Sequence, residues 1–257
     1  MHGIRAVSDS YILVNMESGR IIMERKKYIA AYIAAAIILA AAVPAAIKKT
    51  AKETAAAAGA KADDRPCVVL DAGHGGDDPG KVGINGALEK DLNLEIALLV
   101  KKYLEMDDVR VVMTREGEDG LYDAGASNKK VQDMKRRIAI IEETNPVITV
   151  SIHQNSYPEE YVHGAQVFFY SGSAEGEKLA EKIQNRLIVG LDPDNHRGVK
   201  PNDSYYLLKK TPTTIVIVEC GFLSNTEEAE KLCSEEYQEK LAWEIHLGII
   251  QYLNELK

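Results

Sequence analysis

The strongest constraint on the fold is a short apolar run that ends in glycines, at residues 67–76. The run contains Val68, Val69 and Leu70 and is bounded by turn residues, a pattern that predicts a buried strand covered on both faces. We expect the strand to end near Gly73, so that His74 lies at its carboxyl end, where open α/β sheets bind ligands. The glycines allow a sharp turn and leave space around the imidazole. A plain glycine-rich turn explains this stretch equally well, so support is needed from elsewhere in the chain.

Strand and helix patterns alternate from residue 66 to the end of the chain. The predicted helices span residues 89–106, 131–143, 174–191, 225–233 and 235–256. The further predicted strands span residues 109–114, 147–152, 165–170, 205–208 and 214–218, with 165–170 as a candidate edge strand. This alternation predicts an α/β fold: a single three-layer domain over residues 66–257, with a central, largely parallel twisted sheet flanked by helices.

A second feature lies before this domain, where residues 28–47 form an uncharged, alanine-rich run preceded by basic residues. Twenty apolar residues can cross a bilayer, although a cleaved signal peptide has a similar pattern. We favour an N-terminal transmembrane helix that is not cleaved. The expected organisation is a cytoplasmic tail at 1–27, the anchor or signal segment at 28–47, a linker at 48–65 and the folded domain at 66–257.

Composition excludes some classes of function. The net charge is -8 and no basic stripe is present, so we expect no nucleic-acid partner. The three cysteines, Cys67, Cys220 and Cys233, have neither zinc-ribbon nor disulfide-framework spacing. Cys67 and Cys220 lie in apolar runs, which favours a packing role for both thiols. We expect a monomer.

Three further polar residues lie near predicted strand ends or the glycine turn. His153 follows strand 147–152, Glu219 follows strand 214–218, and Glu89 opens the helix after the glycine loop. Each has a plain explanation, such as a helix-start carboxylate for Glu89 or a lysine partner for Glu219. Together with His74 they would share one crevice, because the carboxyl ends of parallel strands meet there. Two histidines and one glutamate match a zinc shell with an open fourth position, and the other glutamate can then move protons.

Four motifs give the chain a family resemblance. They are residues 70–76 (LDAGHGG), 89–93 (EKDLN), 151–155 (SIHQN) and 218–225 (VECGFLSN). In this order they resemble the zinc-dependent N-acetylmuramoyl-L-alanine amidase family of the amidase 3 type, over about residues 66–256. Residues 195–208 also resemble the spore-cortex CwlD-type members. Ala72, Gln154 and Cys220 depart from residues common in relatives, and none of them replaces a ligand.

The resemblance implies that His74, Glu89 and His153 bind Zn²⁺ and that Glu219 is the catalytic carboxylate. We expect Asn155 and Arg197 to contact the substrate. The implied substrate is peptidoglycan, cut at the amide between N-acetylmuramic acid and L-alanine during remodelling of the cell wall or spore cortex. Because that substrate lies outside the cytoplasm, we expect a single-pass protein of the cytoplasmic membrane with an extracytoplasmic domain, or a secreted protein if the segment is cleaved.

Two alternatives remain open from the sequence. A zinc peptidase acting on stem peptides would use the same metal ligands, and a wall-binding module could keep the fold without catalysis. The four intact polar residues argue against the second alternative. A last expectation concerns access of water and substrate to the metal site. Only residues 154–163 separate His153 from the next strand, which is too few for a covering helix and its connections. We therefore expect an open site.

Overall fold

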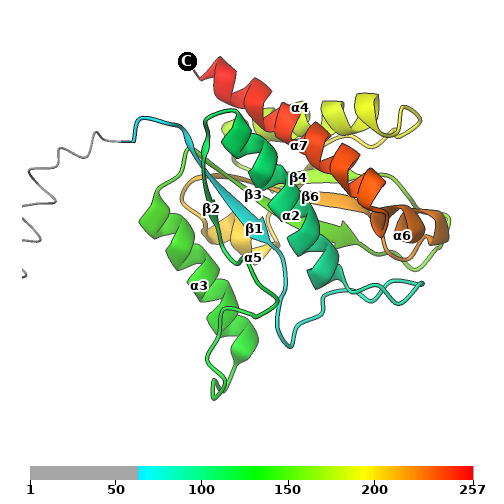
Figure 1. Cartoon of the computed structure of the whole chain (residues 1–257), viewed down its shortest axis with the longest axis horizontal. Coiled ribbons are helices and arrows are strands. Elements are labelled where there is room, and N and C mark those ends of the chain that lie inside the picture. The colour runs from blue at the N-terminus through cyan, green and yellow to red at the C-terminus, as the bar shows by residue number, and fades with distance from the viewer. Residues whose placement is uncertain (1–62, 257) are drawn as a thin grey trace, which may run out of the picture. The chain divides into compact units, whose positions relative to one another are not determined.

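The computed structural model describes residues 63–256 (Figure 1). The predictions for residues 1–62, which include the tail, the transmembrane or signal segment and most of the linker, lie outside the described residues. Among the helices that are described, none is both long and apolar enough to cross a membrane.

The described domain is built on a six-stranded sheet with the order β2-β1-β3-β6-β4-β5. The strands are β1 (Cys67–Ala72), β2 (Arg110–Met113), β3 (Ile148–Asn155), β4 (Gln166–Tyr170), β5 (Lys200–Asn202) and β6 (Thr214–Phe222). All neighbouring pairs are parallel except β4 and β6, which are antiparallel. The sheet is therefore mixed and mostly parallel, and β1, β3 and β6 present their carboxyl ends at one edge.

Helices cover both faces of this sheet (Figure 1). The helices are α2 (Glu89–Met106), α3 (Lys129–Thr144), α4 (Ala174–Gly190), α5 (Tyr206–Lys210), α6 (Thr226–Leu232) and α7 (Glu235–Glu255). The side chains of β1 alternate between two apolar clusters: Val68 and Leu70 join the one formed with α2, α4 and α7, whereas Val69 joins the one formed with α3 and α5. This alternation confirms that β1 is covered on both faces, as its continuous apolar run predicts.

Local signals explain where individual helices begin. The Asn128 side chain accepts a hydrogen bond from the Val131 amide at the start of α3, and Ser173 caps α4 through the Gly176 amide. Such caps satisfy amide groups that have no partner within the helix. Cys67 and Cys220 are buried, and burial raises the pKa of the Cys220 thiol, which supports the packing role expected for both.

Some predicted elements are wrong. The predicted strand at 205–208 is instead the N-cap residue and first turn of helix α5. A short apolar run fits either element, and here Leu207 and Leu208 pack against the sheet. Strand β5, which contains Pro201, escapes prediction; proline is tolerated there because β5 lies at the edge of the sheet. Its presence also means that β4 is not an edge strand.

Two strands are longer than predicted, which changes how the site is supported. Strand β3 continues through His153 to Asn155, and β6 continues through Glu219 to Phe222. His153 and Glu219 are register partners on these adjacent strands. Both side chains are therefore fixed on the sheet itself, rather than on the loops that follow it.

Candidate metal centre and active site

The glycine loop after β1 brings His74 close to the other polar residues. His74 has a left-handed backbone with a φ of 62°, and Gly75 and Gly76 also have positive φ angles. A Cβ atom on Gly73 would lie 2.3 Å from the His153 ring, and one on Gly80 would lie 2.5 Å from Glu89 Oε2. These two glycines are required because the backbone approaches the polar side chains too closely for any larger residue.

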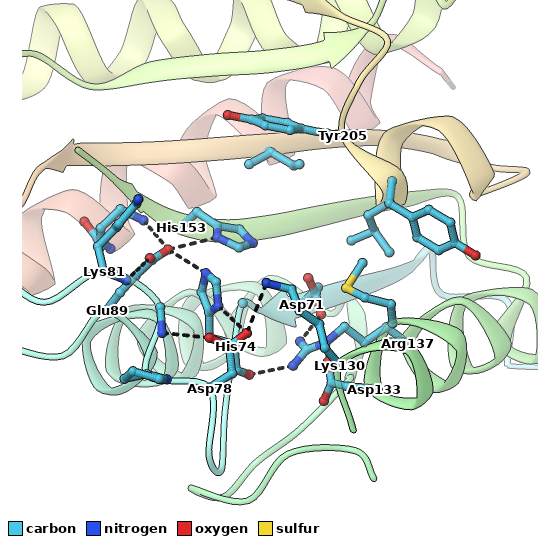
Figure 2. Close-up of a pocket in the computed structure, with 18 of the residues that line it drawn as sticks. Asp71, His74, Asp78, Lys81, Glu89, Lys130, Asp133, Arg137, His153 and Tyr205 are labelled. Atoms are coloured by element: carbon cyan, nitrogen blue, oxygen red, sulfur yellow. Dashed lines mark hydrogen bonds and ion pairs between the residues drawn. The ribbon is translucent and has the colours of Figure 1, made fainter. Parts of the chain in front are cut away.

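His74, Glu89 and His153 converge at one point. His74 Nε2 lies 3.2 Å and His153 Nδ1 lies 2.9 Å from the same oxygen, Glu89 Oε1. One ligand atom from each residue can be chosen so that all three lie within 4.8 Å of one another. Figure 2 shows the three side chains pointing toward a common centre. The structure thus brings together the residues that the sequence predicts as metal ligands.

Neighbouring groups hold these three side chains in place. Asp78 Oδ2 lies 3.0 Å from His74 Nδ1, the nitrogen on the far side of the ring from Glu89. The Lys81 amide donates to Glu89 Oε2 at 2.8 Å, and the Gln154 amide donates to Glu89 Oε1 at 3.1 Å. A carboxylate on the second nitrogen of an imidazole is the usual device that fixes the ring of a metal-binding histidine.

Electrostatics at this point favour a bound cation. Burial opposes charge on Glu89, but the two imidazoles lower its pKa well below the ordinary value. Burial also opposes charge on His74, yet Glu89 and Asp78 raise its pKa above the ordinary value. Carboxylates that stabilise a proton on an imidazole also stabilise a divalent cation in its place. A set of two imidazoles and one carboxylate with an open side suits catalytic zinc.

Glu219 lies beside this cluster, but its carboxyl group is only partly hydrogen-bonded. It is 7% exposed, and its Oε2 atom has no hydrogen-bond partner among the described residues. Burial raises the pKa of Glu219 to about 7, with a further contribution from the charge of Glu89 and opposition from His153. The nearby Tyr205 hydroxyl contributes a hydrogen bond that favours the charged form. A carboxyl group whose pKa is near neutral can both accept and donate a proton, as a catalytic acid–base must.

A cavity of about 830 Å³ opens over these residues and is lined by His74, Glu89, His153 and Glu219. The two histidine side chains are about one-fifth exposed, at 21% and 22%. No helix lies in the described connection between β3 and β4, residues 156–165. This confirms the expectation that no helix inserted between β3 and β4 covers the site.

The two predicted substrate contacts differ in their position. Asn155 lines the cavity, whereas Arg197 lies outside the set of described residues that do so. Arg197 Nε donates to the His163 carbonyl at 2.7 Å, and its guanidinium lies 4.7 Å from the centre of the Phe222 ring. The substrate roles of both residues stay predictions. Sequence reasoning missed Asp78, although its position four residues after His74 in a polar loop was a usable signal.

Comparisons with known proteins agree with this arrangement. A family model described as N-acetylmuramoyl-L-alanine amidase, Amidase_3, matches residues 68–251. The germination-specific N-acetylmuramoyl-L-alanine amidase of Bacillus subtilis is 38% identical over 191 residues, which cover 73% of this chain and 80% of that protein.

Solved structures show the same similarity. The CwlD amidase of Clostridioides difficile, solved in complex with the GerS lipoprotein, is 39% identical with a TM-score of 0.72, over 74% of this chain and all of that one. The amidase AmiC2 of Nostoc punctiforme is 34% identical with a TM-score of 0.64, over 74% of this chain and 97% of that one. The family match, the relatives and the converging His-Glu-His cluster lead to one conclusion: the chain belongs to the Amidase_3 family of N-acetylmuramoyl-L-alanine amidases, enzymes that hydrolyse peptidoglycan.

Proposed function

We propose that this chain is a zinc-dependent amidase in which His74, Glu89 and His153 hold the metal and Glu219 moves the proton. The observation that carries the proposal is the convergence of two imidazole nitrogens and one carboxylate oxygen within 4.8 Å, at the floor of an open cavity. Zinc, when bound, supplies Lewis acidity toward the scissile carbonyl and toward water.

Glu219 performs the proton transfers in this proposal. Its free Oε2 atom takes a proton from the attacking water as the new carbon–oxygen bond forms at the lactyl carbonyl carbon. The same carboxyl group then gives that proton to the nitrogen of L-alanine as the carbon–nitrogen bond breaks. The second proton of the water leaves the new carboxyl group for the amine or for solvent. The products are therefore an unsubstituted N-acetylmuramic acid carboxylate and a peptide with a free amino terminus.

The cellular setting is part of the same proposal. Similarity to a germination-specific amidase and to a CwlD amidase favours a role at the spore cortex over the vegetative wall. Residues 28–47 would anchor the chain in the cytoplasmic membrane with the catalytic domain outside, where peptidoglycan lies. The chain is expected to act as a monomer and to bind no nucleic acid.

The experiment is mass spectrometry of peptidoglycan digested by the purified full chain. The proposal expects intact stem peptides that begin with L-alanine, together with glycan strands whose muramic acid carries no peptide. Cuts within the stem peptides would instead identify a zinc peptidase. Unchanged peptidoglycan in the presence of zinc-loaded protein would identify a binding module.

A further inference from the structure

Two buried guanidinium groups bind the backbone that carries the first histidine of the site. Arg137 Nη1 donates to the Ala72 carbonyl at 2.7 Å, and Arg137 Nη2 donates to the His74 carbonyl at 2.5 Å. Arg115 donates to the Ala72 carbonyl at 2.9 Å and to the Gly73 carbonyl at 3.0 Å. Three consecutive carbonyl groups are therefore fixed by two side chains from distant parts of the sequence.

This support coincides with a strained point in the backbone. His74 has a φ of 62°, a left-handed conformation that is unfavourable for a residue with a Cβ atom. Such conformations persist only where the surrounding structure imposes them. The Arg137 hydrogen bond to the His74 carbonyl acts on this residue directly, and so contributes to the direction in which the imidazole points.

The charge of Arg137 is compensated within the same region. Its side chain is 2% exposed, and Nη1 and Nε lie 2.6 Å from Asp71 Oδ1 and Asp133 Oδ2, respectively. Asp71 also accepts hydrogen bonds from the Thr114 and Ser151 hydroxyls. Figure 2 shows Asp71, Arg137 and Asp133 together, next to His74. The planar guanidinium bridges two carboxylates and two carbonyls at once, which a lysine ammonium cannot reproduce.

We propose that Arg137 is a positioning residue for the metal site, holding His74 in the backbone conformation that directs its imidazole toward Glu89 and His153. Asp71 and Asp133 orient the guanidinium for this task. Arg137 is one of the residues that line the cavity, and it acts on the metal site through its hydrogen bond to the His74 carbonyl. The inference rests on the proposed metal site.

The test compares Arg137→Lys with Arg136→Lys in the full chain. Arg136 is the adjacent residue of α3, but its side chain is only partly buried and pairs with Asp123. Two measurements are made: zinc affinity, by competition with a chromophoric chelator, and the visible absorption spectrum after replacement of zinc by cobalt. Supporting groups of metal ligands are typically worth 10–100-fold in affinity, so we expect a loss of about that size and an altered cobalt spectrum for Arg137→Lys only.

Circular dichroism will show whether Arg137→Lys folds, and a second variant provides the test if it does not. Asp133→Asn keeps the shape of the side chain and leaves Arg137 in place, while weakening one of its two carboxylate contacts; we expect a smaller loss of zinc affinity in the same direction. Parent-like zinc affinity and cobalt spectrum in folded Arg137→Lys, or in Asp133→Asn if the first variant is unfolded, would overturn the inference. A parent chain that binds no zinc would instead overturn the proposed function.

Discussion

Two clusters of buried charge lie side by side at the carboxyl ends of β1 and β3, and they differ in how completely their groups are paired. The arginine cluster consists of Asp71, Thr114, Asp133, Arg137 and Ser151. The metal cluster consists of His74, Glu89, His153 and Glu219. In the arginine cluster, Arg137 lies between two carboxylates and Asp71 accepts three hydrogen bonds from side chains. In the metal cluster, two carboxylates and two imidazoles line one cavity, and Glu219 Oε2 has no partner among the described residues.

This difference indicates that the arginine cluster fixes the structure, whereas the metal cluster is arranged for chemistry. Buried polar groups are almost always paired, because an unpaired one loses its hydration without compensation. A fully paired cluster therefore holds its groups in one arrangement, whereas an incompletely paired one that faces a cavity indicates a place for a ligand. The glycine loop joins the two, since its backbone binds Arg137 and its His74 side chain faces Glu89.

The largest effect is expected for Glu219→Gln, which changes the unpaired group of the metal cluster. The amide has nearly the same shape but cannot carry a proton, so turnover on peptidoglycan should fall by about 10²–10⁴-fold. Zinc content, measured by atomic absorption, should stay at the parent level. The contrasting variant is Glu89→Gln, which should weaken zinc binding itself. Parent-like turnover in Glu219→Gln would show that the two glutamates are wrongly assigned.

A smaller effect is expected for Asp78→Asn, which acts on the orientation of a ligand. Loss of the carboxylate beside His74 Nδ1 should weaken zinc binding by about 10–100-fold in a chelator competition assay. The matched control is Asp77→Asn, because Asp77 is the preceding residue and pairs with Lys129 instead of a histidine. Equal zinc affinities in the two variants would remove Asp78 from the site.

The smallest effect is expected in the arginine cluster, as a dependence of stability on pH. Burial opposes the charge of Asp71, but Arg137 and the two hydroxyls lower its pKa from 3.8 to about 2. A carboxyl group with a lowered pKa stabilises the fold above its ordinary pKa, and this stabilisation is lost as the pH falls through the folded value. The shift corresponds to about 2 kcal/mol of unfolding free energy, lost between about pH 4 and pH 2.

Urea denaturation of the metal-free chain at a series of pH values measures this effect. Asp71→Asn should be less stable than the parent at pH 6 and should lack about 2 kcal/mol of the parent's decline in acid. Asp123→Asn is the control, since Asp123 also pairs with an arginine of α3 but is exposed, where solvent screens the pair. An acid decline in Asp71→Asn as steep as that of the parent would show that the pair does not contribute in this way.

The contrast between the clusters also explains what the sequence could predict. His74, Glu89, His153 and Glu219 each follow or open an element with a clear pattern, so their meeting at the sheet edge follows from the general geometry of parallel strands. The family motifs then assign their expected roles. The extensions of β3 and β6 were not predictable, because polar residues near a strand end look like the start of a loop.

The arginine cluster could not be found in the sequence. Arg137 lies in the basic segment KRR of an amphipathic helix, where charged residues usually face solvent. Its spacing from Met134 and Ile141 places it on the apolar face, but that spacing does not identify the groups that pair with it. Its burial depends on Asp71, 66 residues away, and on the carbonyl groups of Ala72 and His74, which accept its hydrogen bonds. Short elements such as α5 and β5 were mispredicted for a related reason, since packing decides their conformation more than local preference does.

The most direct test of the account is the zinc content of the full chain and of its His74→Ala and His153→Ala variants, after dialysis against a weak chelator. If the two imidazoles and Glu89 hold the metal, the parent should retain one zinc ion per chain and each variant should lose most of it, because each removes one of three protein ligands. One zinc ion per chain in both variants would contradict the account.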